Sequence, residues 1–201
     1  MSFDRPSTLG EHRSPLKLNQ PTRRGIALFS LALIMSLGTG CSSRIWAPMH
    51  AAAKLDNPQK IRNLVAKGAD VNSTKHHGHR SPLYTAAHYD SPNAAKALLD
   101  AGADPNQAHA GGSTPLMVAA QKGSYRIAEM MLAKGGDPNR QAKNGYGALH
   151  YAVQGGHVQM VKLMLKNKAN ANLQDRRGRS PFDLAMKLGD ADVIVAMGGV
   201  P

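Results

Sequence analysis

From residue 47 to residue 198, short apolar segments alternate with polar loops in a pattern that returns every 33 residues. One marker is the triplet Ser81-Pro82-Leu83, whose counterparts begin at residues 114, 147 and 180. A second marker is an Asn that runs in phase with it, at residues 72, 106, 139 and 172. Two independent markers that share one period predict an array of structural repeats.

Each unit of this array predicts two short helices. A Ser or Thr before Pro is typical of a helix N-cap, and Pro suits the first helical position because its missing N–H costs nothing there. A second segment carries an apolar face, such as Ile127, Met130 and Met131, and ends near a Gly that suits a left-handed helix terminus. Because two short helices cannot bury this face alone, neighbouring units must stack to form the core.

The period, the Pro-Leu caps, paired alanines such as Ala86-Ala87 and the segment Gly-Ala-Asp-Pro-Asn at 102–106 resemble the ankyrin repeat. The resemblance covers residues 47–198 and implies an all-α ankyrin-repeat solenoid of about five helix-turn-helix units with short hairpin loops. We expect these units at residues 47–72, 73–106, 107–139, 140–172 and 173–198. The resemblance also implies that His50 and His150 are structural hydrogen-bonding groups. Gly147-Ala148 replaces the usual Thr-Pro, which removes a cap worth about 1 kcal/mol.

The first 40 residues follow a different pattern. Arg23 and Arg24 precede an apolar run at 26–37, which as a helix would span about 18 Å against the ~30 Å of a bilayer core. A positive flank, a short apolar run and small residues before Cys41 predict an export signal over residues 1–40.

This stretch resembles a bacterial lipoprotein signal, although Gly38 stands where that family usually has Leu. The resemblance implies lipidation of Cys41 and anchoring in a membrane, with residues 41–46 as a tether. Ser42 and Ser43 resemble the family's outer-membrane sorting pattern, so we expect a lipoprotein on the periplasmic side of the cell envelope. The alternative is an ordinary secretory signal with a chance cysteine.

Composition and charge narrow the possible functions. The 201 residues include 25 Lys and Arg against 13 Asp and Glu, a formal net charge of +12, and the 42% of apolar residues excludes a wholly disordered chain. No nucleophile elbow, phosphate-binding loop or pair of carboxylates across a cleft is present, so we expect no enzyme and no cofactor. An exported, tethered protein seldom meets nucleic acid, so we do not expect that partner.

The family resemblance places partner binding on a concave face made by the hairpin tips and the first helices. These positions carry hardly any acid, the nearest being Asp175. A basic surface concentrates anionic partners, so we expect the chain to bind an acidic protein. We expect the chain itself to be a monomer. A solvated face that only keeps the array soluble is the alternative. The predicted contacts are Lys75, His76, His77, His79, Arg80, His88, Tyr89, His109, Lys122, Lys143, Asn144, Tyr146, Arg176, Arg177 and Arg179.

The run His76-His77-Gly78-His79 also suggests a metal site. However, it has no nearby carboxylate or thiolate ligand, and Lys75 and Arg80 flank it with repelling charge, so we predict no metal site there. Exported ankyrin proteins of Gram-negative bacteria include inhibitors of effector toxins and proteins linked to peroxide defence. The first role is our hypothesis. The alternative is a structural or stress-related envelope protein (peroxide or metal) that contacts anionic lipid.

Overall fold

The computed structural model describes residues 42–74 and 79–199, and the residues in these ranges form helices joined by turns and loops, without a strand. The chain divides into two units, residues 1–40 and 41–201, and everything described lies in the second. The helices are α2 (Ser42–Lys54), α3 (Pro58–Ala66), α4 (Pro82–His88), α5 (Pro92–Asp100), α6 (Pro115–Lys122), α7 (Tyr125–Ala133), α8 (Ala148–Gln154), α9 (Val158–Lys166), α10 (Pro181–Leu188) and α11 (Ala191–Ala196).

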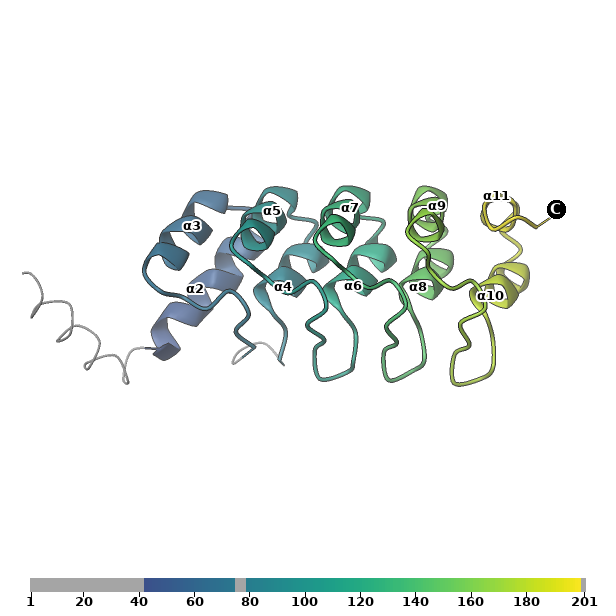
Figure 1. Ribbon diagram of the computed structural model, residues 1–201, viewed down its shortest axis with the longest axis horizontal. Coiled ribbons are helices and arrows are strands. Elements are labelled where there is room, and N and C mark those ends of the chain that lie inside the picture. The colour runs from purple at the N-terminus through teal and green to yellow at the C-terminus, as the bar shows by residue number, and fades with distance from the viewer. Residues whose placement is uncertain (1–41, 75–78, 200–201) are drawn as a thin grey trace, which may run out of the picture. The chain divides into compact units, whose positions relative to one another are not determined.

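The helices form two rows, as Figure 1 shows. The first helices of the pairs, α2, α4, α6, α8 and α10, make one row, and the second helices, α3, α5, α7, α9 and α11, make the other. Each helix contacts its pair partner and the equivalent helix of the next unit; α4, for example, packs against α2, α5 and α6. This arrangement confirms the predicted all-α ankyrin solenoid.

The first helices begin as the sequence predicts in three of the units. The hydroxyl oxygens of Ser81, Thr114 and Ser180 each accept a hydrogen bond from the backbone N–H three residues later, at 3.1, 3.3 and 3.1 Å. The leucines after the first two caps, Leu83 and Leu116, are fully buried, so one short motif both starts a helix and supplies a core residue.

The first unit departs from this pattern. Helix α2 begins at Ser42 and therefore includes residues 42–46 of the tether expected at residues 41–46. Pro48 consequently lies inside the helix rather than at its first position. Its ring provides no N–H for the helical hydrogen bond at that point, whereas Pro82 begins α4 without such a loss.

Small residues bring the first helices close together. Ala86, Ala119, Ala120, Ala152 and Ala185 are fully buried in the core between the two rows. A larger side chain at these positions would force neighbouring units apart, since well-packed cores have little space to absorb it.

The loops that follow the second helices are joined by a row of asparagines, called here the Asn ladder: Asn72, Asn106 and Asn139. Each side-chain oxygen accepts a backbone N–H of the next unit, at 2.8, 2.8 and 2.7 Å along the chain. Each side-chain amide donates to a backbone carbonyl of that same unit, at 3.3, 2.9 and 3.1 Å. The ladder therefore fixes the spacing between consecutive repeats.

Several predictions fall on residues outside those described: the signal at 1–40, the lipidation site Cys41 and the tip residues Lys75, His76 and His77. Within residues 42–74 and 79–199, none of the helices has the length and apolar character needed to cross a membrane.

Candidate functional site

Hairpin tips project from the loops between successive helix pairs, past the row of first helices (Figure 1). Short backbone hydrogen bonds close them, from Ala142 N–H to the Tyr146 carbonyl at 2.9 Å and from Asp175 N–H to the Arg179 carbonyl at 2.9 Å. Neighbouring tips are also joined, because Lys143 N–H donates to the Gly111 carbonyl at 3.0 Å. The tips are therefore held at the fixed spacing of the helices behind them.

The predicted contacts that the structure describes lie on these tips and on the first helices, and together they are called here the basic tip face. Two pockets open among them. The amino-terminal pocket includes the predicted residues Arg80, His88 and Tyr89, and the carboxy-terminal pocket includes five others. Outside both pockets lie His79, His109, Lys122 and Lys143. The basic tip face consists of His79, Arg80, His88, Tyr89, His109, Lys122, Lys143, Asn144, Tyr146, Arg176, Arg177 and Arg179.

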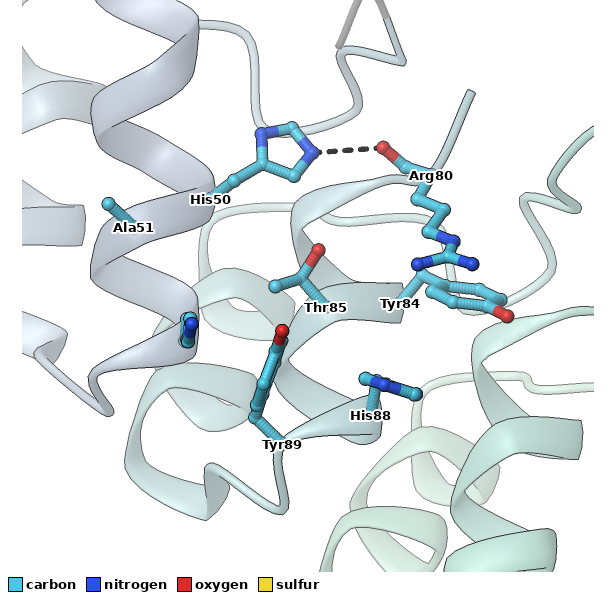
Figure 2. A pocket seen from close by; sticks show the side chains of 8 residues that line it. His50, Ala51, Arg80, Tyr84, Thr85, His88 and Tyr89 are labelled. Carbon is cyan, nitrogen blue, oxygen red and sulfur yellow. Dashed lines mark hydrogen bonds between the residues drawn. The ribbon is translucent and has the colours of Figure 1, made fainter. Parts of the chain in front are cut away.

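The amino-terminal pocket lies between α2 and α4 and has a volume of about 230 Å³ (Figure 2). His50 on α2 donates from Nε2 to the carbonyl oxygen of Arg80 at 2.9 Å, which ties the end of the tip loop to the helix. The guanidinium of Arg80 lies over the ring of Tyr84, 5.4 Å from its centroid. The pocket is lined by His50, Ala51, Lys54, Arg80, Tyr84, Thr85, His88 and Tyr89.

A second cation stands over a second aromatic ring in this pocket. Lys54 Nζ lies 4.8 Å from the ring centroid of Tyr89, which is 49% exposed. His88 meets the Tyr89 ring edge-on at 5.0 Å. Burial lowers the pKa of His88, and the nearby charges of Lys122 and Arg80 lower it further, so the imidazole is neutral at pH 7. The pocket thus combines positive charge with aromatic walls and no lining carboxylate.

The carboxy-terminal pocket, of about 560 Å³, lies between α8 and α10 and the tips beside them. Its one acid, Asp175, is buried and accepts hydrogen bonds from Arg179 Nη2 at 2.7 Å and Nε at 2.9 Å. Backbone N–H groups of Arg177 and Arg179 donate to the same carboxylate at 2.7 and 3.0 Å. Burial raises the pKa of Asp175, but these hydrogen bonds from Arg179 and Arg177 outweigh it and hold the pKa at about 2.

The three predicted arginines of this pocket therefore have different roles. Arg179 is committed to the buried Asp175, and its Nη2 also donates to the Tyr146 hydroxyl at 3.2 Å. Arg176 and Arg177 are exposed beside it. We assign Arg179 to holding the tip in shape and keep Arg176 and Arg177 as the predicted contacts.

Two other predicted contacts take part in the tip structure. The ring of His109 stacks on Tyr84 with centroids 5.1 Å apart, and its Nδ1 accepts the N–H of Gly111 at 2.9 Å. His79 has a positive φ of 62°, a backbone conformation that residues other than Gly seldom adopt.

The structure confirms the structural role expected of His50 and His150. Fully buried His150 accepts the N–H of Gly147 at Nδ1 (3.2 Å) and donates from Nε2 to the carbonyl oxygen of Arg179 (3.2 Å). Burial lowers the pKa of His150, so the neutral imidazole that this pair of bonds requires is favoured.

Lys54 and Tyr84 line the amino-terminal pocket but are not among the predicted contacts. An alignment of the repeats with one another could have identified both residues. Pairing Ala52-Ala53 with Ala86-Ala87 places Lys54 opposite His88, a predicted contact. The same register places Tyr84 opposite His50 and His150, so an aromatic ring fills a position that other units use for a histidine.

That the histidine-rich tip holds no metal stays a prediction, because His76 and His77 lie outside the described residues. Among the residues that the structure does describe, no three His, Cys, Asp or Glu side chains converge as a metal site would require.

Comparison with known families adds a match over most of the chain. A family model for ankyrin repeats in three copies matches residues 32–109, 49–142 and 116–197. No curated protein gives a significant match to the chain.

Proposed function

The chain belongs to the ankyrin-repeat family, whose repeats form protein–protein interaction modules, and we propose that this module binds an acidic protein through its basic tip face and catalyses no reaction. The observation that carries this proposal is the distribution of charge. The exposed cations Arg80, Lys122, Lys143, Arg176 and Arg177 share that face, and its buried acid is neutralised by Arg179. Such a surface attracts an acidic partner and speeds the encounter.

The scaffold behind this face favours binding. Hydrogen bonds between neighbouring tips and the Asn ladder hold the binding groups in place before a partner arrives, so little conformational entropy is lost on association. Tyr89 supplies an exposed aromatic ring, a type of residue that is common at the energetic centre of interfaces.

The test is affinity capture from a cell-envelope extract with the full chain. The double variant Arg176→Glu plus Arg177→Glu reverses charge on the basic tip face, and Lys60→Glu plus Lys162→Glu makes the same charge change on exposed positions of α3 and α9. We expect the first variant to lose a protein that wild type and the second variant both retain. Equal capture by all three proteins would contradict the proposal.

We further propose that the protein is exported and anchored through lipid on Cys41, on the periplasmic side of the envelope and in the outer membrane. The residues before and after Cys41 support this. In cells, Cys41→Ser should prevent incorporation of labelled palmitate and move the protein from the membrane fraction to the soluble fraction. Membrane retention of the serine variant without label would argue for another mode of attachment.

We propose that the partner is an acidic effector toxin that acts in the periplasm. This protein would be its inhibitor. Purified wild-type protein should protect target cells or membranes from the captured protein, and the Arg176→Glu plus Arg177→Glu variant should not. Flotation with anionic vesicles, without capture of any protein, would instead support the envelope role in which the basic tip face contacts lipid.

A further inference from the structure

We propose that the amino-terminal pocket receives a single acidic side chain of a bound protein, whose carboxylate is held by Lys54 and Arg80. This inference rests on the proposed function and adds to it the chemical group that the partner presents. It places the specific anchor of the interface between α2 and α4, at the opposite end of the array from the arginine-rich tip.

The first argument is unsatisfied charge. Lys54 and Arg80 each face an aromatic ring, and no ion pair joins either of them to a carboxylate within the described ranges. Their ammonium and guanidinium groups keep N–H donors that a ring face does not satisfy as a carboxylate does. A carboxylate accepts charge-assisted hydrogen bonds from both types of cation, and a guanidinium can bind it through two parallel bonds.

The second argument is size and shape. At about 230 Å³ the pocket is smaller than the roughly 300–1,000 Å³ of typical small-molecule sites, so it suits one side chain better than a cofactor. The half-exposed ring of Tyr89 (Figure 2) forms an apolar wall against which the methylene groups of a glutamate can pack. Charge for the carboxylate and aromatic surface for the stem occur together in the pocket.

The third argument is preorganisation. The His50 hydrogen bond holds the backbone of Arg80 at 2.9 Å, and the Thr85 hydroxyl donates to the Ser81 carbonyl at 3.2 Å, which fixes another wall of the pocket. A site that is already formed loses less entropy on binding. The larger carboxy-terminal pocket differs, because its buried Asp175 already occupies Arg179.

The test is a titration of the ¹⁵N-labelled full chain followed by NMR. The probe is a short blocked peptide with glycines around one glutamate, and the matched probe replaces the glutamate with glutamine. The glutamate peptide should cause saturable shifts of the amide signals of Ala51, Thr85 and Tyr89, which line the pocket. Equal shifts with the glutamine peptide, or shifts confined to the carboxy-terminal pocket, would overturn the inference.

Variants complete the test. Lys54→Gln plus Arg80→Gln should weaken the binding of the glutamate peptide roughly tenfold or more, since two charge-assisted interactions are lost. Lys60→Gln plus Lys162→Gln removes the same charge from the second helices and should bind as wild type does. All four positions are exposed, so melting temperatures should be unchanged and a loss of binding reports on the pocket.

The two proposals fail in different ways. If Arg176→Glu plus Arg177→Glu abolishes capture but the glutamate peptide does not reach the pocket, the proposed function stands and this inference is wrong. If the peptide binds as described but Arg176→Glu plus Arg177→Glu leaves capture unchanged, the pocket stands and the proposed function is wrong.

Discussion

The Asn ladder and the basic tip face belong to the same repeats but use their polar side chains in opposite ways. Asn106 recurs in register with the other ladder residues and bonds to the next unit with both its oxygen and its amide. On the tip face, the side chains of Lys143, Arg176 and Arg177 are exposed and, within the described ranges, make no hydrogen bond to the protein. Polar groups that are satisfied internally stabilise the array, and those left solvated are available to a partner.

The last tip shows that location alone does not decide which role a residue has. Arg179 lies on the basic tip face, yet its guanidinium donates two hydrogen bonds to a buried carboxylate. The comparison therefore concerns how a side chain's hydrogen bonds are used, and variants can test it residue by residue.

The largest expected effect is on the ladder. Asn106→Ala removes two hydrogen bonds between repeats and leaves Asp137 N–H and the Gly135 carbonyl without those partners. We expect the free energy of unfolding to fall by about 1–3 kcal/mol, as measured by urea denaturation.

The end of the ladder provides the control. Asn172 stands in the same register, but its side chain makes no hydrogen bond to a following unit in the part of the chain that the structure describes. Asn172→Ala should therefore change the unfolding free energy by less than about 0.5 kcal/mol. Equal losses for Asn106→Ala and Asn172→Ala would show that the bonds between repeats do not stabilise the array.

The next effect separates two arginines on one tip. Arg179→Gln should lower the melting temperature, because it removes the guanidinium that pairs with Asp175, although two backbone N–H groups still donate to that carboxylate. Arg177→Gln should leave the melting temperature unchanged, because the backbone N–H of Arg177, which reaches the carboxylate, is retained. Thermal melts followed by circular dichroism test this, and similar shifts for both variants would contradict the division of roles.

Low pH should weaken the ion pair between Asp175 and Arg179. In the folded chain the pKa of Asp175 is about 2, against its ordinary value of 3.8, so the ionised carboxylate stabilises the fold. This contribution is complete above about pH 3.8 and is lost as the pH falls from there towards 2. The stability difference between wild type and Asp175→Asn should therefore narrow over that range in urea denaturation curves. A difference that does not change with pH would mean that the carboxylate is not held by its charge.

The sequence predicts the helix caps better than the tips, and it gives the ladder residues only as an Asn that recurs with the period. The period and the Ser-Pro or Thr-Pro starts are local signals, and they give the starts of α4, α6 and α10 correctly. Helix α2 is different: Pro48 follows an alanine and stands in the register of Pro82, the first residue of α4, yet it lies inside a longer helix. Local propensity cannot show how far a helix extends on the other side of a proline.

The roles of the tip arginines depend on contacts that the sequence does not show. Arg176, Arg177 and Arg179 look alike in the sequence, and only the folded hairpin brings one of them onto Asp175. The amino-terminal pocket is similar, because Lys54 and Arg80 come from different repeats and line one pocket only when α2 packs against α4. Residue type predicts a basic surface, and three-dimensional packing decides which charges are free.

The smallest expected effect is at Gly147, where the sequence suggests a lost cap. Its N–H already donates to His150, so one bond of the cap is present without a hydroxyl. In Gly147→Ser the new Cβ would lie 2.7 Å from Leu173 Cδ2, and this contact should cancel the few tenths of a kcal/mol that Ser gains over Gly. In a Leu173→Ala background the gain should appear, as urea denaturation of the double-mutant cycle can show. A stabilisation of about 1 kcal/mol in the wild-type background would contradict this, because it would mean that Leu173 moves aside at no cost.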